Sequence, residues 1–316
     1  MPELPDITVY LEHLQSRVVG KELERLDIPK PFVLRSFNPP VSELVGKTVR
    51  AVRRMGKRIV LAMDDELFIV IHLMIAGRLR WLPAGKAAPK KLSLATFAFD
   101  AGTLVLTEAG TTRRASLSLI RGRDALSQMD RGGLDVFASD FSAFATRLRS
   151  ENHTLKRSLT DPRLFDGIGN AYSDEILHRA RLSPVALSGR ISDDDAVRLY
   201  DATRVVLREW TDRLRAETGD KFPDRVTAFR PEMAVHGKYG EPCPVCGTKV
   251  QRIVYADNEA NYCPTCQTEG RLLADRSLSR LLKDDWPRTL EELEDRKRGA
   301  VAAPPAPARP APAKRR

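Results

Sequence analysis

The chain has 316 residues, of which 42% are hydrophobic and 30% are charged, and its formal net charge is +10. It is long enough for two or more domains with hydrophobic cores, and no apolar run approaches the length of a membrane span. The positive charge favours a polyanionic partner, which makes nucleic acid the first candidate, although a basic chain need not bind nucleic acid. We therefore expect a soluble protein with no membrane partner.

The N-terminal part predicts one helix followed by strands. Ile7, Tyr10, Leu14 and Val18 recur at helical spacing, and Gly20 ends the run, so that a helix is expected to begin near residue 6. Short β-branched and apolar segments then recur between turn signals, at residues 21–28, 48–55, 58–63, 67–72, 95–99, 104–107 and 115–120. This pattern predicts a β-sandwich or barrel, with the helix covering it, over residues 1–125.

The period becomes helical from about residue 141. A long final helix begins after Ser192, with an acidic first turn, and ends at Gly219. We expect an all-α domain over residues 140–234, and hence an α+β multidomain fold. Residues 273–316 form an extension with one or two short polar helices, and its Pro/Ala-rich and basic end is predicted to be disordered.

The chain's four cysteines lie close together in sequence, as Cys243, Cys246, Cys263 and Cys266, with the spacing C-x2-C-x16-C-x2-C. Two close pairs of thiolates suit a closed, tetrahedral zinc site. Two disulfides are the alternative, which the absence of a secretory signal disfavours. We predict a zinc finger over residues 235–272 that binds one structural Zn²⁺.

The chain begins Met-Pro-Glu-Leu-Pro-Asp. A small second residue normally permits removal of Met1, which would leave Pro2 with a free secondary amine, a nucleophile that can form an iminium with a sugar carbon. The positive end of the following helix favours the neutral amine, and Glu3 beside it can donate or accept a proton. Taken alone, a Met-Pro start more often has no catalytic meaning.

Five motifs occur in one order along the chain: the N-terminal hexapeptide, Gly56-Lys57, His72-Leu73 before Gly77, Gly167-Ile168-Gly169-Asn170-Ala171-Tyr172, and Val235-His236-Gly237-Lys238 running into Cys243. This order resembles formamidopyrimidine-DNA glycosylase and its relative endonuclease VIII. The resemblance covers about residues 1–267. Leu4 stands where endonuclease VIII typically has glycine, which favours the formamidopyrimidine branch.

The resemblance implies a DNA-repair enzyme that is both a glycosylase and an abasic-site lyase, acting on double-stranded DNA with damaged bases or abasic sites. Pro2 would be the Schiff-base nucleophile and Glu3 the proton donor that opens the sugar. Lys57, on a predicted strand, would assist β-elimination and hold a phosphate. We expect a monomer in the cytoplasm, associated with the nucleoid if bacterial. A non-catalytic DNA-binding protein that has kept the scaffold is the alternative from another class.

The implied substrates are oxidised purines and formamidopyrimidines, while oxidised pyrimidines, or abasic sites alone, remain open. Asp6 stands where the formamidopyrimidine branch usually has glutamate, and this shorter side chain near the base pocket could shift the preference.

The helical domain resembles the family's helix-two-turn-helix, in which Lys156 and Asn170 would contact DNA phosphates. A glycosylase must also unstack the damaged nucleotide and fill the space that it leaves. Ile75 occupies the place of the family's void-filling methionine, and Met74 replaces a glycine. Arg113, in a loop that differs from the family's, is the candidate that would face the orphaned base.

The tip of the finger departs from the family pattern as well. The family has an arginine five residues before the third cysteine, and this chain has Asn258. An asparagine can still hydrogen-bond a phosphate, although it lacks the charge and the forked donors of arginine. Arg252 or Lys249 would be the nearby residues able to compensate.

Overall fold

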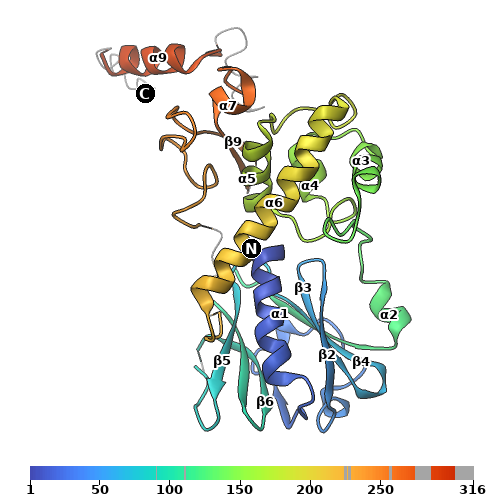
Figure 1. Ribbon diagram of the computed structural model, residues 1–316. Helices are drawn as coiled ribbons and strands as arrows, with labels where there is room; N and C mark the ends of the chain where they lie inside the picture. The colour runs from blue at the N-terminus through green and yellow to red at the C-terminus, as the bar shows by residue number, and fades with distance from the viewer. Residues whose placement is uncertain are drawn as a thin grey trace, which may run out of the picture.

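The computed structural model describes residues 1–89, 91–109, 112–223, 226, 229–255, 258–274 and 286–302. Figure 1 shows a layered β-structure at one end of the molecule and a group of helices at the other, with the C-terminal hairpin beside the helices. The predicted α+β multidomain architecture is confirmed. None of the described helices is long and apolar enough to cross a membrane.

The N-terminal part contains helix α1 and strands β1 to β8. Their bounds are α1 (Leu4–Val18), β1 (Arg25–Asp27), β2 (Val49–Met55), β3 (Arg58–Met63), β4 (Leu67–His72), β5 (Gly77–Pro83), β6 (Ser93–Phe99), β7 (Gly102–Glu108) and β8 (Ser116–Arg121). Short 3-10 turns lie at Pro31–Val33, Val41–Glu43 and Asp64–Glu66. The strands form two four-stranded antiparallel sheets, with the orders β1-β6-β7-β5 and β2-β3-β4-β8, as the predicted sandwich requires.

Helix α1 covers the sandwich with the face that its spacing predicts, since Ile7, Tyr10, Leu14 and Val18 are each 0% exposed. The helix begins at Leu4, slightly earlier than the sequence indicates. The reason is a capping box, in which the backbone N–H of Glu3 donates to the Asp6 carboxylate at 3.0 Å.

The central strands are apolar because they are buried on both faces. Ile59 and Leu61 of β3 point into the main core between the sheets, whereas Val60 belongs to a smaller cluster on the outer face. Leu126 of helix α2 (Arg123–Ser127) covers that outer cluster. Each fully buried aliphatic side chain contributes about 1.5 to 3 kcal/mol to folding.

Strand β5 was missed by the sequence prediction. It carries Arg78 and Arg80 between its apolar residues and ends at Pro83, so that its sequence is more typical of a turn region than of a strand. Its pairing with β7 along its whole length is a tertiary effect that local composition does not reveal.

The helical part consists of α3 (Phe141–Arg149), α4 (Leu155–Thr160), α5 (Asn170–Ala180) and α6 (Asp193–Thr218). The predicted start of α6 is confirmed, because the Ser192 hydroxyl accepts from the Asp195 N–H at 3.1 Å. Figure 1 shows α6 running from the helical group down to α1, where Arg215 forms an ion pair with Glu12 at 2.6 Å. This long helix therefore joins the two halves of the molecule.

The C-terminal part contains the hairpin β9 (Gln251–Tyr255) and β10 (Asn258–Tyr262), the short helix α7 (Pro264–Thr268) and helix α9 (Leu290–Ala302). Helix α9 agrees with the expectation of a polar helix in this region. The Pro/Ala-rich tail that was predicted to be disordered lies, from residue 303 on, outside the described residues.

Candidate active site

The N-terminus is held against the turn that precedes helix α5. The N–H of Leu4 donates to the Gly167 carbonyl at 2.9 Å. The buried Glu3 carboxylate accepts from the N–H groups of Gly169 at 2.6 Å and Ala171 at 2.9 Å, with a longer contact of 3.4 Å from Tyr172. The first N–H groups of a helix have no acceptor within the helix itself, and a carboxylate placed there is stabilised. These contacts hold Glu3 in a fixed position beside the Gly-x-Gly turn.

Lys57 approaches the same point from the sandwich. It lies in the turn between β2 and β3 and not on a strand as expected, because Gly56 has a φ of +64°, which lets the chain reverse there. A Cβ atom on Gly169 would lie 2.4 Å from Lys57 Nζ and 2.5 Å from Glu3 Cδ. Gly169 is therefore the residue that allows the ammonium and the carboxylate to come together.

Burial lowers the pKa of Lys57, while the nearby Glu3 and Asp166 carboxylates oppose that shift. Burial likewise lowers the pKa of the chain's terminal amine at Met1. Both effects favour neutral amines, the form in which an amine is a nucleophile or a base.

A cleft of about 850 Å³ opens beside these groups. Its lining includes Met1, Lys57 and Gly169, together with Lys156 of α4 and Tyr255 of the hairpin. The cleft thus brings together the N-terminus, the helical part and the C-terminal hairpin. Its basic groups suit a phosphate-bearing ligand.

An ion-pair network around Arg54 joins the sandwich to the helical part of the chain. Arg54 on β2 donates to Asp166 at 2.5 Å and to Asp135 at 2.6 Å. The Arg54 side chain is 14% exposed, and the two carboxylates come from the helical half of the chain. This contact fixes the turn that carries Gly169 against the sandwich.

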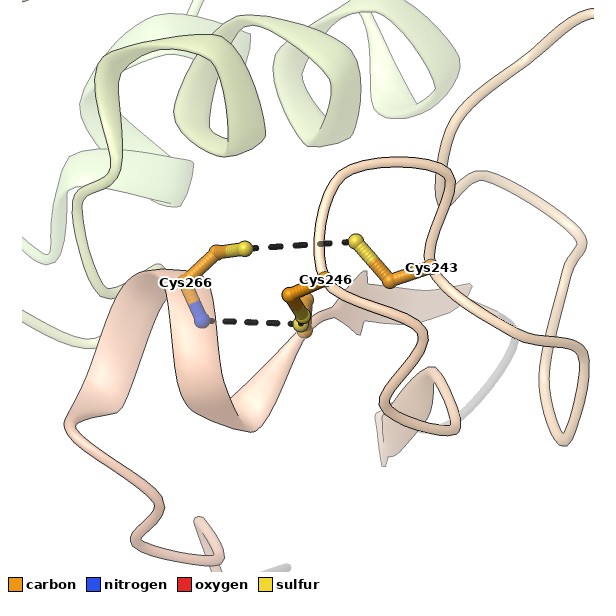
Figure 2. Close-up of side chains that lie close together, drawn as sticks. Cys243, Cys246 and Cys266 are labelled. Atoms are coloured by element: carbon orange, nitrogen blue, oxygen red, sulfur yellow. Dashed lines mark hydrogen bonds between the residues drawn. The ribbon is translucent and has the colours of Figure 1, made fainter.

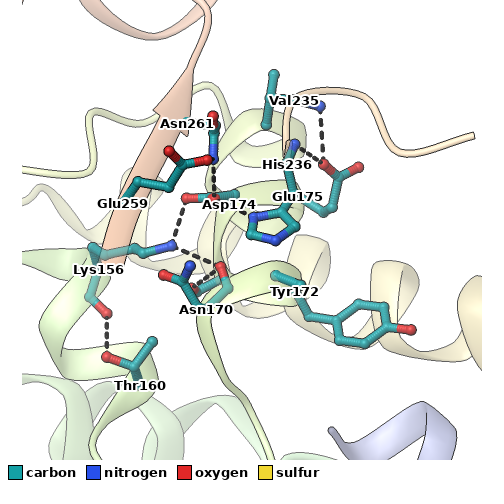
Figure 3. A network of polar contacts seen from close by, with 12 residues as sticks. Lys156, Thr160, Asn170, Tyr172, Asp174, Glu175, Val235, His236, Glu259 and Asn261 are labelled. Carbon is teal, nitrogen blue, oxygen red and sulfur yellow. Dashed lines mark hydrogen bonds and ion pairs between the residues drawn. The ribbon is translucent and has the colours of Figure 1, made fainter. Parts of the chain in front are cut away.

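Lys156 and Asn170, the predicted phosphate contacts, lie next to each other. Lys156 Nζ donates to the Asn170 carbonyl at 2.7 Å and to Asp174 Oδ1 at 2.5 Å (Figure 3). Asp174 also accepts from His236 Nδ1 at 2.8 Å and from Asn261 Nδ2 at 3.3 Å.

Asp174 and its neighbour Glu175 were not singled out from the sequence. Glu175 accepts from the N–H groups of Ala234, Val235 and His236 at 2.8 to 2.9 Å, which anchors the chain as it enters the finger. The sequence carried one signal for them: two adjacent acidic residues follow the Gly-x-Gly-Asn motif after three other residues, and so lie on the helix that the motif begins.

Ile75 lies in the turn between β4 and β5, with its side chain 58% exposed. Met74 before it has a φ of +52°, a left-handed conformation that glycine adopts more easily. Arg78 holds this turn, because its guanidinium donates to the carbonyls of Ile75 at 3.0 Å and Val226. The exposed apolar side chain on a braced turn is the geometry that a wedge requires.

Arg113 is half-buried in the loop before β8. The end of that loop is fixed by the buried Glu108 carboxylate, which accepts from the N–H groups of Arg114 at 3.0 Å and Ala115 at 3.1 Å. The loop's central residues 110 and 111 lie outside the described part of the chain.

Asn258 is the first residue of β10 and pairs with Tyr255 across the hairpin, while its side chain lies outside the described part. The two basic residues that could replace the family's finger arginine have partners of their own. Arg252 pairs with Glu259 at 3.2 Å, and Lys249 pairs with Glu294 of helix α9 at 2.5 Å.

The four predicted metal ligands come together. The sulfur atoms of Cys243, Cys246, Cys263 and Cys266 all lie within 4.8 Å of one another, and Figure 2 shows three of these side chains converging between the finger loop and α7. The contacts Cys246–Cys263 at 3.3 Å and Cys243–Cys266 at 3.9 Å are close to the roughly 3.8 Å that Zn–S bonds of about 2.3 Å in a tetrahedron imply. Four protein ligands leave no open position, so this set fits one structural zinc.

A smaller cavity, of about 230 Å³, lies between α1, the end of α6 and the segment that follows it. Buried Asp6 and Arg230 line it, with Arg230 3.6 Å from one Asp6 oxygen. Burial raises the pKa of Asp6 to about 6, although its hydrogen bond from Glu3 and the charge of Arg230 act in the opposite direction.

The sandwich, the helix-two-turn-helix segment and the four-cysteine finger around one basic cleft define a class of DNA glycosylases. Models of three domains match the chain: the formamidopyrimidine-DNA glycosylase N-terminal domain over residues 1–114, the H2TH domain of the same enzymes over 133–217, and the zinc finger found in FPG and IleRS over 240–268. The chain belongs to the formamidopyrimidine-DNA glycosylase family.

Full-length relatives agree. The formamidopyrimidine-DNA glycosylase of Thermus thermophilus is 34% identical over 279 residues, which cover 85% of this chain and 100% of the relative. That of Heliobacterium modesticaldum is 32% identical over 283 residues, or 84% and 100% of the two chains. A Lactococcus lactis FPG variant, solved in complex with DNA containing Fapy-dG, superposes with a TM-score of 0.75 at 25% identity, covering 84% of this chain and 100% of that one.

Proposed function

We propose that this protein is a bifunctional DNA glycosylase and abasic-site lyase that removes oxidised bases from double-stranded DNA through a Schiff base at Pro2. The observation that carries the proposal is the meeting of Glu3 and Lys57 at Gly169, on the wall of a basic cleft. Met1 lines the same cleft, so its removal would present the Pro2 amine there. A protein that only binds DNA has no need of this convergence.

The reaction follows from the groups present. The Pro2 nitrogen bonds to the anomeric carbon of the damaged nucleotide as the bond to the base breaks, and the base leaves with the electron pair and takes up a proton. The Glu3 carboxylate takes up the proton that the Pro2 nitrogen gives up, and transfer of this proton to the ring oxygen opens the sugar and gives the iminium. Loss of a proton from C2′ then expels the 3′ phosphate, and water hydrolyses the iminium to return the amine. Lys57, beside Glu3, assists the elimination and holds the phosphate.

The DNA backbone is held on the other walls of the cleft. Lys156 and Asn170 are the proposed phosphate contacts at the start of α5, where a helix N-terminus favours an anion. Ile75 fills the space of the extruded nucleotide, and Arg113 faces the orphaned base. Asn258 at the start of β10 is the proposed DNA contact of the finger, in place of an arginine.

Each part of the chain has its own role in this proposal. Residues 1–125 carry the catalysis, residues 140–234 and the finger at 235–272 hold the DNA, and residues 273–316 form an extension. We place the protein in the cytoplasm, on the chromosomal DNA of the nucleoid if the source is bacterial. The family's name and the Fapy-dG complex of its L. lactis relative support formamidopyrimidines and oxidised purines as substrates.

Borohydride trapping tests the mechanism, because reduction of the iminium leaves the protein joined to an abasic-site oligonucleotide. We expect an adduct with the processed protein and none when an uncleavable N-terminal extension turns the Pro2 amine into an amide. The Pro2→Gly variant should also lose most of the adduct. The same extension at the C-terminus and the variant Lys21→Gln, at an exposed ion pair, serve as controls.

Failure of processed, zinc-loaded protein to form an adduct would reject the catalytic proposal and leave DNA binding alone. Duplexes with single lesions then identify the base. Release of a formamidopyrimidine or an oxidised purine supports the proposed substrate. Release of oxidised pyrimidines only, or cleavage confined to abasic sites, would replace it with one of the two alternatives.

A further inference from the structure

Asp174 occupies an unusual place in the helical part. Its side chain is completely buried, with 0% exposure, on the first turns of helix α5. An isolated buried carboxylate is strongly disfavoured, and it is retained only where donors surround it. This site therefore requires a reason beyond ordinary packing.

Three donors satisfy Asp174, and they come from three separate segments (Figure 3). Lys156 Nζ on α4 contacts Oδ1 at 2.5 Å, while His236 Nδ1, at the start of the finger, and Asn261 Nδ2 on β10 contact Oδ2 at 2.8 and 3.3 Å. The Asp174 carboxylate thus links helix α4 and the finger to helix α5.

Lys156 is placed by this contact. An ammonium group has three N–H donors, and two of them point to Asp174 and to the Asn170 carbonyl. Within the described part of the chain the third has no acceptor, so it is available to a ligand in the cleft that Lys156 lines. A lysine side chain otherwise has much rotational freedom, which must be lost when it binds a phosphate.

We propose that Asp174 is a positioning residue for DNA binding: it holds Lys156 pointing into the cleft and at the same time fixes strand β10 of the finger against helix α5. The inference rests on the proposed function, since it takes DNA as the occupant of the cleft. Beyond that function, it assigns to the buried Asp174 carboxylate the placement of Lys156 on the basic surface of the cleft.

The direction in which DNA affinity changes when the charge of Asp174 is removed distinguishes a positioning role from a purely electrostatic one. Asp174 is negative, so through space it repels DNA, and removing its charge without moving any other group should tighten binding. If Asp174 positions Lys156 and the finger, removing its charge weakens binding instead. The variant Asp174→Asn keeps the shape of the side chain and therefore decides between these outcomes.

The experiment measures affinity for a duplex with a tetrahydrofuran abasic-site analogue, which cannot form a Schiff base. We expect Asp174→Asn to weaken binding roughly tenfold, and to have a clearly smaller effect in a Lys156→Gln background, where only the contact with the finger remains to be lost. The rate of borohydride trapping at saturating abasic-site DNA should stay near that of the unchanged protein, which places the effect in binding. Zinc content and the unfolding midpoint show whether the variants are folded.

A second pair of variants keeps the test decisive if Asp174→Asn does not fold. His236→Asn keeps an N–H donor near the position of Nδ1, whereas His236→Phe keeps a ring beside Phe229 and removes the donor. We expect His236→Phe to bind more weakly than His236→Asn.

Equal or tighter binding by Asp174→Asn, or equal binding by the two His236 variants, would overturn the inference. Additive effects of Asp174→Asn and Lys156→Gln would also reject the positioning of Lys156. If the unchanged protein binds the duplex but forms no adduct with abasic-site DNA, the proposed catalysis fails while this inference stands. If it does not bind the duplex at all, both fail.

Discussion

The backbone N–H of Gly169 donates a hydrogen bond of 2.6 Å to the Glu3 carboxylate, from a position 166 residues further along the chain. Glu3 directly follows the proposed nucleophile, and Gly169 caps the helix that begins with Asn170. The helix-two-turn-helix segment therefore forms part of the proposed catalytic site as well as of the proposed DNA-binding surface.

Replacing Gly169 by Ala should separate the catalytic groups. The added Cβ would lie 2.4 Å from Lys57 Nζ and 2.5 Å from Glu3 Cδ, and at least one of the two must move. Because a displacement near 1 Å costs on the order of 100-fold in rate, we expect a loss of that size in the rate of borohydride trapping. Affinity for the tetrahydrofuran duplex should fall much less, because Lys57 is only one of the proposed phosphate contacts and Lys156 is not displaced. Trapping at the unchanged rate would show that the spacing of Glu3 and Lys57 does not matter.

Two arginines on strand β2 should differ in their effect on stability. Arg54 is 14% exposed and pairs with Asp135 and Asp166, whereas Arg50 is 64% exposed and pairs with Asp64. Burial raises the pKa of Asp166 despite Arg54, so part of the cost of losing Arg54 is relieved by protonation. We expect Arg54→Ala to lower the free energy of unfolding by about 2 kcal/mol and Arg50→Ala by less than about 1 kcal/mol. Urea denaturation measures both, and equal losses would contradict the structural role of Arg54.

The sequence predicts the parts of this site that depend on spacing or on a motif. The four cysteines are recognisable because their spacing is itself the constraint, and the Ser192 cap marks the start of α6 locally. Glu3 and Lys57 were predicted through the resemblance. Their meeting at Gly169 depends on tertiary structure, which the sequence does not display.

The residues that were missed have distant partners. Asp174 contacts Lys156, His236 and Asn261, which lie 18, 62 and 87 positions away. No local pattern distinguishes such a carboxylate from an exposed acid on a helix, because its burial depends on how three segments pack. Strand β5 was missed for a related reason: Arg78 and Arg80 conceal a strand that its neighbour β7 stabilises.

Ile75 should act on base extrusion and not on sugar chemistry. It is 58% exposed on the turn after β4, and it is not among the residues that contact Glu3. We expect Ile75→Ala to slow excision of a damaged base from a duplex roughly tenfold or more, because the unstacked space is no longer filled. Cleavage of a preformed abasic site should be much less affected. Val197→Ala, at an exposed position on α6, is the matched control, and equal loss on both substrates would reject the wedge role.

Asp6 should make stability depend on pH between about 4 and 6. Burial raises its pKa from 3.8 to about 6, so the folded protein retains this proton in a range where the unfolded chain releases it. Asp6 therefore lowers stability progressively as the pH rises through that range, and its effect is constant above it. Asp6→Asn cannot titrate, can still accept from the Glu3 N–H, and leaves Arg230 its pair with Glu217.

Urea denaturation of both proteins at several pH values tests this. The advantage of Asp6→Asn over the unchanged protein should grow by on the order of 2 to 3 kcal/mol from pH 4 to pH 6 and then level off. Asp201→Asn, at an exposed site on α6, should show no such trend. An advantage that does not vary with pH would contradict the raised pKa.

The zinc site should depend on a residue outside the finger. His178 on α5 is buried, and its Nε2 lies 3.2 Å from Cys243 Sγ, where a ring N–H can donate to a thiolate. Donors of this kind orient metal ligands, and their loss typically costs about 10- to 100-fold in metal affinity. We expect His178→Leu to release zinc to a chromophoric chelator correspondingly faster, and cobalt substituted for zinc to show a shifted thiolate charge-transfer band.

His13→Gln, on the partly exposed side of α1, is the matched control and should retain zinc normally. Complete removal of zinc should abolish DNA binding while the sandwich stays folded, because its core shares no residue with the finger. Unchanged zinc retention in His178→Leu would show that the Cys243 contact does not support the metal site. Full DNA affinity after chelation would show that the finger is dispensable for binding, and the hairpin would then have to be placed outside the DNA-binding surface.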